Sequence, residues 1–217
     1  MRVIDQYHVI LTDISDGGID ELQRIEQAGR VAYKSINFDG DFTKTKNFIQ
    51  RLISSGHESV LEHSSMTVQF TTDRGVTHEL VRHRLASYTQ ESTRYCNYSK
   101  GKFGSELTFI RPVIFDKTTD GFVEFYRACQ SAEEYYMKLL EVGWTPEFAR
   151  AVLPNAIKAD IVMTANYREW RHMLKLRTAN DAHPQIRALM RSFADELHQR
   201  IPVIFDDIPG TEGGTNV

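Results

Sequence analysis

Cysteine is scarce in this sequence, and long apolar runs are missing. The two cysteines, Cys96 and Cys129, are too few for a disulfide framework, so we expect reduced thiols and a cytoplasmic location. No apolar run approaches the ~20 residues that a membrane span needs, and the first residues lack the apolar stretch of a signal peptide. The sequence therefore predicts a globular cytoplasmic protein without a membrane partner.

Two nucleotide-binding patterns and a strong charge imbalance are also missing. No Gly-x-Gly-x-x-Gly follows a predicted strand, and no Gly-x-x-x-x-Gly-Lys-Ser/Thr loop occurs. We therefore expect no Rossmann unit and no use of ATP. The net charge of −3 argues against a general nucleic-acid binder, because such proteins are usually strongly basic. A local basic pocket remains compatible with this charge.

The order of the predicted elements favours an α+β fold. Period-two alternation predicts strands, and apolar spacing of three or four residues predicts helices. The predicted strands cover residues 3–12, 66–72, 107–113 and 157–165. The predicted helices cover residues 19–33, 42–55, 77–85, 122–140, 146–152, 167–176 and 184–200. Because strands and helices do not alternate regularly, we predict a mixed or antiparallel sheet packed with several helices.

The length of 217 residues and the apolar content of 41% fit one core. We therefore predict a single catalytic domain over residues 1–217, with a mobile tail at 210–217. The polar segment 87–100 is predicted to be a loop, and Gly56 a helix C-cap. The most regular helical stripe is predicted to face inward, and it comprises Phe122, Phe125, Tyr126, Cys129, Ala132, Tyr136, Leu139 and Leu140.

Residues 82–94 concentrate side chains that bind phosphate. The segment mixes hydroxyl and amide side chains with charged ones, which are Arg82, His83, Arg84, Glu91 and Arg94. Arginine's planar fork matches phosphate oxygens in pairs. On the predicted helix 77–85, neighbouring side chains point about 100° apart and cannot all contact one ligand group. The segment predicts a site for a small phosphorylated ligand, against the alternative of a solvated basic helix end.

Four ordered stretches then resemble one known family. Arg82-His83-Arg84, followed after seven residues by Ser92, resembles the signature of the flavin-dependent thymidylate synthases. Residues 56–63, 149–154 and 166–177 resemble three further segments of that family. The resemblance covers about residues 1–205, and four matches in the right order argue against an accidental one.

The resemblance implies reductive methylation of dUMP to dTMP. Methylenetetrahydrofolate would supply the carbon, FAD would carry the hydride, and NADPH would reduce the flavin. It also implies a homotetramer whose sites are shared between subunits, with no nucleic-acid partner. The alternative from another class is a flavin-free nucleotide- or RNA-binding module, in which the arginines bind phosphates and tyrosines stack on bases.

Site residues follow from the same resemblance. Arg177 would be catalytic, stabilising negative charge on the pyrimidine as N3 loses its proton, and His57 would lie on the folate side. Ser92 would orient the substrate. The dUMP-binding residues would be Glu79, Leu80, Val81, Arg82, Gln90, Glu91, Ser92, Thr93, Arg94, Arg150 and Arg177. The FAD-binding residues would be Ser59, Arg82, His83, Arg84, Gln90, Asn166, Tyr167, Arg168 and His172. Some relatives carry other residues at Thr89, Gln90 and His172.

Several candidates have simpler interpretations. His57 and His63 lack metal-ligand spacing and would face nearly opposite sides of a helix, so we predict no metal site. Glu58 and Glu62 are predicted to cap or to form ion pairs, and Arg171 to be an ordinary surface arginine. Arg168 and His172, four residues apart, share a helix face. Cys129 is predicted to lie in the core, and nothing marks Cys96 as an activated thiolate.

Overall fold

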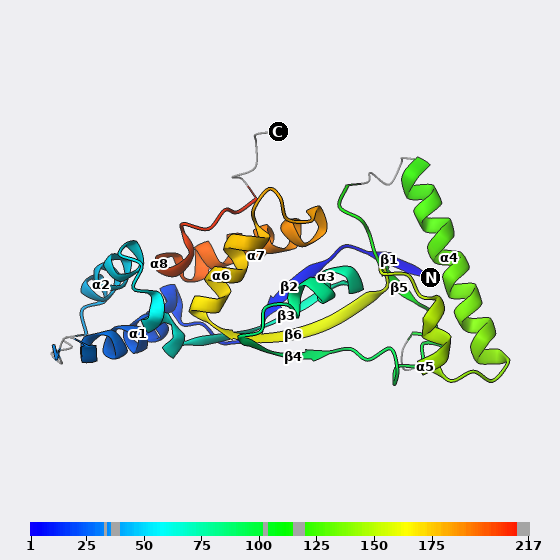
Figure 1. The fold of residues 1–217 in the computed structure, drawn as a ribbon, viewed down its shortest axis with the longest axis horizontal. Coiled ribbons are helices and arrows are strands. Elements are labelled where there is room, and N and C mark those ends of the chain that lie inside the picture. Colours follow the sequence, from blue (N-terminus) through cyan, green and yellow to red (C-terminus); the bar gives the residue numbers. More distant parts are fainter. Residues whose placement is uncertain (33, 36–39, 102–103, 115–119, 212–217) are drawn as a thin grey trace. The chain divides into compact units, whose positions relative to one another are not determined.

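The fold mixes helices and strands, which confirms the predicted α+β class (Figure 1). The computed structural model describes residues 1–32, 34–35, 40–101, 104–114 and 120–211. Residues 212–217 of the predicted mobile tail lie outside the described residues. None of the described helices is long and apolar enough to cross a membrane.

The described strands form two sheets. In the smaller sheet, β1 (Arg2–Ile4) pairs in parallel with β5 (Thr108–Ile110). The larger sheet has the strand order β2-β3-β6-β4. Its members are β2 (Tyr7–Ile10), β3 (Ser65–Asp73), β6 (Lys158–Asn166) and β4 (Ala86–Gln90). The single strand predicted over 3–12 is therefore wrong, because β1 and β2 belong to different sheets.

The prediction of a loop over residues 87–100 is wrong at its start, where β4 lies. Its side chains alternate between half-buried and exposed. Its half-buried face combines Ala86 and Tyr88 with the polar Gln90, so the apolar alternation is too short for a sequence pattern to predict a strand.

The chain forms two compact units. Unit 1 comprises residues 1–8, 69–82 and 88–162, and unit 2 comprises residues 9–68, 83–87 and those from 163 onward. The boundaries fall within β2, β3, β4 and β6, so each of these strands contributes residues to both units. The single catalytic domain over residues 1–217 stays a prediction.

Unit 1 contains α3 (Arg74–Leu80), α4 (Asp120–Glu141), α5 (Pro146–Ala149) and the short η4 (Arg150–Val152). The core residues include Leu107, Phe109, Cys129, Tyr136 and Ile157. The predicted stripe of α4 is confirmed at Cys129 and Tyr136, and Phe125 packs against the same cluster. Tyr126 is 41% exposed, so its predicted inward position is wrong. It follows Phe125 directly and points about 100° away from it.

The predicted helix 77–85 is displaced toward the N-terminus. The Asp73 carboxylate accepts the Val76 N–H at 2.8 Å, which begins α3 at Arg74. A helix continuing to Arg84 would bond the Arg84 N–H to the Leu80 carbonyl. That carbonyl accepts the Tyr88 hydroxyl at 2.7 Å instead. Arg82, His83 and Arg84 therefore follow the helix, and the helical geometry predicted for them does not apply.

Unit 2 contains most of the helices. They are η1 (Asp16–Gly18), α1 (Ile19–Ala32), α2 (Phe42–Ser54), η2 (Glu58–His63), α6 (Tyr167–Arg177), α7 (Pro184–Arg200) and α8 (Pro202–Phe205). Gly56 has a φ of 73° and ends α2 as predicted, because the His57 N–H bonds to the Leu52 carbonyl. The apolar side of α7 is buried as its spacing predicts.

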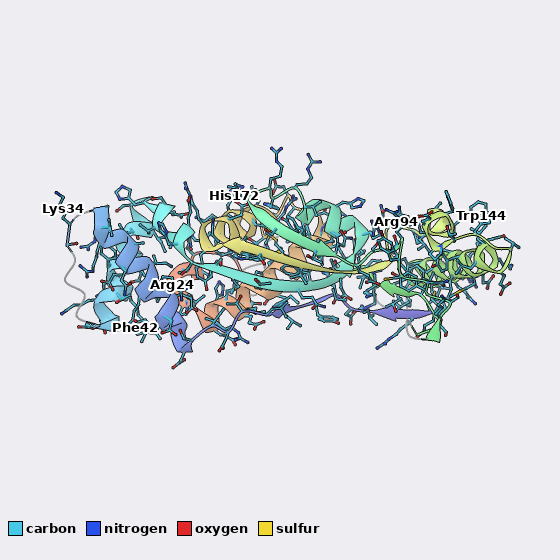
Figure 2. The ribbon with its side chains drawn as sticks, turned by 90° about the horizontal axis from the view of Figure 1, so that it is seen from below. Arg24, Lys34, Phe42, Arg94, Trp144 and His172 are labelled. Carbon is cyan, nitrogen blue, oxygen red and sulfur yellow. The ribbon has the colours of Figure 1, made fainter. Side chains whose placement is uncertain are left out.

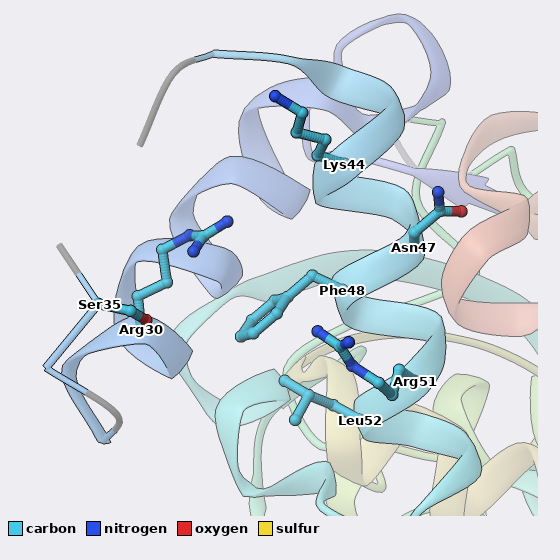
Figure 3. A pocket seen from close by; sticks show the side chains of 7 residues that line it. All are labelled: Arg30, Ser35, Lys44, Asn47, Phe48, Arg51 and Leu52. Atoms are coloured by element: carbon cyan, nitrogen blue, oxygen red, sulfur yellow. The ribbon is translucent and has the colours of Figure 1, made fainter. Parts of the chain in front are cut away.

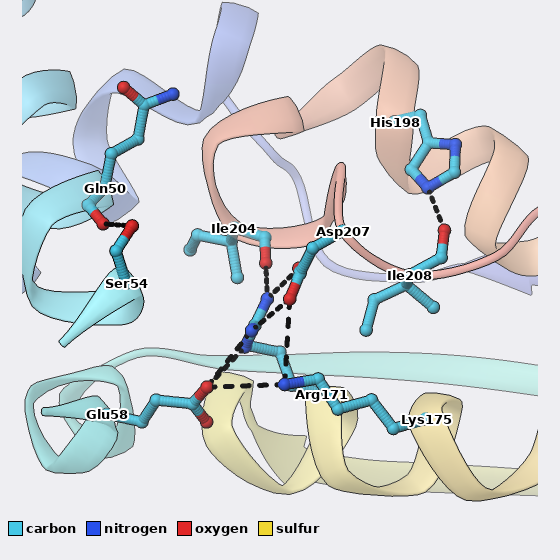
Figure 4. A network of polar contacts seen from close by, with 9 residues as sticks. All are labelled: Gln50, Ser54, Glu58, Arg171, Lys175, His198, Ile204, Asp207 and Ile208. Atoms are coloured by element: carbon cyan, nitrogen blue, oxygen red, sulfur yellow. Dashed lines mark hydrogen bonds and ion pairs between the residues drawn. The ribbon is translucent and has the colours of Figure 1, made fainter. Parts of the chain in front are cut away.

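Arg171 on α6 is fully buried, so its prediction as a surface arginine is wrong. Its guanidinium bonds to both Asp207 oxygens at 2.6 and 2.8 Å, to Glu58 at 3.1 Å, and to the Ile204 carbonyl (Figure 4). The Glu58 contact confirms the predicted ion-pair role of that residue. This one side chain joins α6 to η2 and to the segment after α8.

Removing the Arg171 guanidinium should destabilise the protein. We expect Arg171→Leu to lower the free energy of unfolding by about 3 kcal/mol. Glu58 and Asp207 would lose their nearest cation and keep only the half-exposed Lys175 ammonium, at 3.5 and 3.7 Å. Arg200→Leu is the matched control, since Arg200 forms an exposed pair with Glu196 and should change stability by less than about 1 kcal/mol. Urea unfolding at neutral pH measures both, and equal effects would contradict the role assigned to Arg171.

Candidate active site

Unit 2 contains a cavity of about 620 Å³ beside the first turns of α6. It is lined by Glu58, Glu62, Leu85, Asn166, Arg168, Glu169, His172 and Lys175. Asn166 begins the helix, because its side-chain oxygen accepts the Glu169 N–H at 2.9 Å. Arg168 and His172 both line the cavity, as expected for residues four apart on a helix. The cavity thus unites three of the residues predicted to bind FAD.

Carboxylates balance the positive side chains at this cavity. Arg168 bonds to Glu62 at 2.5 Å, which confirms the predicted ion-pair role of Glu62. Both side chains are about half exposed. Such a pair contributes little to stability, so a phosphorylated ligand can replace the carboxylate at small cost.

Arg177, at the end of α6, is held by His83. Its Nε–H donates to His83 Nε2 at 3.1 Å, and His83 Nδ1 lies 3.5 Å from a Glu169 oxygen. Burial, followed by the positive charge of Arg177, lowers the pKa of His83 to about 4. His83 is therefore neutral at pH 7, with Nε2 as an acceptor and its N–H directed at Glu169.

His83, Glu169 and His172 also present ligand atoms within 4.8 Å of one another. Three such groups can bind a metal ion, but the Arg177 guanidinium already occupies His83 Nε2. A second positive charge at this position would be repelled. The cluster is better explained by hydrogen bonding to Arg177, and the absence of a metal site stays a prediction.

In unit 1, the segment after β4 brings several predicted phosphate ligands together. Arg150 donates to the hydroxyl of buried Thr93 at 3.2 Å. The Arg94 N–H bonds to the Ser92 hydroxyl at 3.3 Å. The Arg94 guanidinium, labelled in Figure 2, pairs with Glu147 at 3.3 Å. Two arginines and two hydroxyls of the predicted dUMP set thus lie around one turn.

Other predicted residues are placed less favourably for direct contact. Leu80 and Tyr167 are fully buried. Among the described residues the Tyr167 hydroxyl has no hydrogen-bond partner, and burial raises its pKa. Any flavin contact of Tyr167 would have to use its backbone. The exposed predicted residues are His57, Ser59, Val81, Arg82, Arg84, Arg94, Arg150, Arg168 and His172, while Glu79, Gln90, Glu91, Ser92, Asn166 and Arg177 are half-buried.

The sequence patterns do not identify Lys158, Asp160 and Tyr98. All three contact the Glu91 carboxylate or its backbone. Lys158 and Asp160 are two residues apart and therefore share one face of β6. The sequence offered one signal for them: Lys158 and Asp160 are charged residues at the start of a strand that was predicted to be apolar.

A second cavity in unit 2, of about 490 Å³, lies between α1 and α2 (Figure 3). It is lined by Arg30, Ser35, Lys44, Asn47, Phe48, Arg51 and Leu52. The guanidinium groups of Arg30 and Arg51 lie 5.2 and 5.8 Å from the Phe48 ring centre. Arg30 is already paired with buried Glu26. None of the predicted site residues lines this cavity.

Neutral His83 makes stability depend on pH. Its folded pKa of about 4 lies below the ordinary 6.5, so the unfolded chain takes up this proton first as pH falls. The free energy of unfolding should therefore decrease from pH 6.5 down to about pH 4. We expect a smaller decrease for His83→Gln, measured by urea unfolding across this range. An equal decrease in both proteins would show that His83 is not buried in its neutral form.

Comparison with known proteins agrees with the resemblance seen in the sequence. The family model described as "Thymidylate synthase complementing protein" matches residues 18–203. A flavin-dependent thymidylate synthase from Corynebacterium aurimucosum is 32% identical, with 90% of this chain and 83% of that protein covered. One from Geobacter sulfurreducens is 34% identical, with 86% and 84% covered.

The fold also matches solved structures. The UMP/dUMP methylase PolB from Streptomyces cacaoi, crystallised with 5-Br dUMP, superposes with a TM-score of 0.76. It is 24% identical, and the superposition covers 95% of this chain and 96% of that chain. At this identity the likeness concerns the fold. The family model and the two relatives, both named flavin-dependent thymidylate synthase, show that the chain belongs to the thymidylate synthase complementing protein family.

Proposed function

We propose that the protein is a flavin-dependent thymidylate synthase that methylates dUMP to dTMP. Methylenetetrahydrofolate donates the carbon, and NADPH is the reductant. Within this family, the observation that carries the proposal is the guanidinium of Arg177 held by neutral His83. A fixed cation is what the ionising pyrimidine needs, because a preorganised charge stabilises the charge that develops in the transition state.

The cavity beside α6 has the chemistry to hold FAD. Arg168 and Lys175 offer positive charge to a pyrophosphate, and His172 offers a ring and a hydrogen-bonding nitrogen. Asn166 contributes an amide. Bound FAD would supply the hydride, while these side chains bind and orient it.

The turn after β4 is the proposed site of the dUMP phosphate. Arg94 and Arg150 supply paired donors, and the hydroxyls of Ser92 and Thr93 lie beside them. The exposed Glu147 carboxylate forms an ion pair with the Arg94 guanidinium. A bound phosphate, which carries more negative charge, would replace that carboxylate. Apart from Arg177, all the residues proposed for dUMP belong to unit 1, whereas those for FAD belong to unit 2 apart from Arg82 and Gln90.

Arg177 acts on the base. Its Nε–H is committed to His83, which fixes the orientation of the guanidinium plane. From this position it stabilises negative charge as N3 of the pyrimidine loses its proton, which makes C5 electron-rich. A cysteine nucleophile is not required by this scheme. Burial raises the pKa of Cys129 to about 11, so that thiol stays protonated at neutral pH.

Arg177→Ala tests the catalytic role. We expect dTMP formation to fall at least about 100-fold, while the purified protein keeps its yellow flavin absorbance. Arg200→Ala, which changes an exposed arginine of α7, should leave both readouts unchanged. If the Arg177→Ala enzyme forms dTMP near the wild-type rate, the proposed catalytic role of Arg177 is wrong. A colourless wild-type protein that does not take up FAD would overturn the function and favour the flavin-free binding module.

The homotetramer and the cytoplasmic location are also proposals. Large apolar side chains of unit 1 are exposed, including Tyr135 at 57%, Trp144 at 50% and Phe148 at 61%. Trp144 is labelled in Figure 2. Exposed apolar surface of this kind is common where subunits meet, which supports an assembly through α4 and α5.

Introducing a charge on α4 tests the assembly. We expect Tyr135→Asp to shift the protein to a smaller species in light scattering coupled to size exclusion, because a buried carboxylate at the interface is costly. Asn47→Asp, at an exposed position of α2, is the control for one added negative charge and should leave the mass unchanged. A wild-type monomer, or a Tyr135→Asp protein of wild-type mass, would contradict assembly through α4.

A further inference from the structure

Glu91 is an acid within a segment proposed to bind phosphate. A carboxylate beside Ser92, Thr93 and Arg94 would repel a phosphate dianion if it faced the ligand. Its two oxygens are engaged elsewhere. One accepts the Tyr98 hydroxyl at 2.8 Å, and the other accepts the Lys158 ammonium at 2.7 Å and the Asp160 N–H at 3.2 Å.

Lys158 and Asp160 complete this network on β6. The Lys158 ammonium also bonds to Asp160 at 2.8 Å, and the second Asp160 oxygen accepts the Thr71 hydroxyl at 2.5 Å. The Glu91 N–H bonds to the Asp160 carbonyl at 2.8 Å. Glu91 is therefore attached to the strand through both its side chain and its backbone.

Burial and charge keep the network ionised. Burial alone would lower the pKa of Lys158, but hydrogen bonds to Asp160 and Glu91 outweigh it and raise the pKa. Burial would raise the pKa of Asp160, but the bonds from Lys158 and Thr71 outweigh it and lower the pKa. The side chains of Lys158 and Glu91 are only 20% and 16% exposed, so water screens this pair less than a surface pair.

The turn that follows is held from its other side. The Ser92 carbonyl accepts the N–H groups of Tyr95 and Cys96 at 3.1 and 3.0 Å. Thr93 is buried against Arg150. The backbone is thus attached to β6 at Glu91, before the turn, and held within the turn by the Ser92 carbonyl and Thr93. These contacts restrict the conformation of the residues proposed to bind phosphate.

We propose that Lys158 and Asp160 are positioning residues for dUMP: they hold Glu91 to β6, cancel its charge and fix the phosphate-binding turn at residues 92–94. This inference rests on the proposed dUMP site. Glu91 stays a predicted dUMP residue through its backbone, since its carboxylate is bonded to the protein. The ligand class concerned is a nucleoside 5′-monophosphate.

Lys158→Met tests the proposal in the FAD-loaded enzyme, because it leaves Glu91 and Asp160 without their cation. We expect dUMP to bind about ten-fold more weakly. The kcat at saturating dUMP should stay unchanged, and so should the FAD content of the protein. Deoxyuridine, which lacks the phosphate, should bind with wild-type affinity. In Glu91→Gln/Lys158→Met no extra negative charge remains beside the turn, so dUMP affinity should recover to within about three-fold of wild type.

Two comparisons keep the result interpretable. Lys44→Met, which removes a 61% exposed lysine of α2, should leave dUMP affinity unchanged. Lys158→Gln replaces Lys158→Met if that variant does not fold. Unchanged dUMP affinity in the Lys158 variants, or equal losses for dUMP and deoxyuridine, would overturn the positioning role. A wild-type enzyme that does not bind dUMP would instead overturn the proposed function.

Discussion

The buried guanidinium of Arg171 is the interaction on which unit 2 depends. It bonds to Glu58, Asp207 and the Ile204 carbonyl, and so ties α6 to two segments far away in sequence. Burial would raise the pKa of Asp207, but the hydrogen bonds and charge of Arg171 outweigh it and keep the pKa below 3.8. Because α6 carries Asn166, Arg168, His172 and Arg177, the geometry proposed for flavin and for the ionising base follows from this anchor.

The ion pairs of the candidate site fall into two classes by exposure. Arg94–Glu147 and Arg168–Glu62 are about half exposed, so water screens them and a ligand phosphate can replace the carboxylate. Lys158–Glu91 and Arg171–Glu58 are mostly buried, and removing either cation would take away the nearest opposite charge of a carboxylate that water reaches little. The first class is suited to ligand binding. The second is suited to holding the backbone that presents the ligand-binding groups.

Sequence patterns were reliable where one face of an element is apolar. The spacing in α7 and in most of α4 predicted their buried sides, because core packing selects apolar residues at helical intervals. The patterns failed at β4 and at the end of α3. In β4 both faces carry polar residues. The helix α3 ends at Leu80, whose carbonyl accepts a hydrogen bond from the Tyr88 hydroxyl. That hydrogen bond joins two different elements, so the periodicity within either one does not predict it.

By itself, the sequence determined the α+β class, the family and the set of side chains available for phosphate, flavin and base. These depend on residue types at fixed spacings along the chain. Only the tertiary structure decided which charges meet. It buried Arg171 against a carboxylate 36 residues away, neutralised His83 beside Arg177, and turned Glu91 from the proposed ligand toward Lys158, 67 residues on. Such pairings are set by packing and by the cost of leaving a charge buried without a partner, and local spacing does not record them.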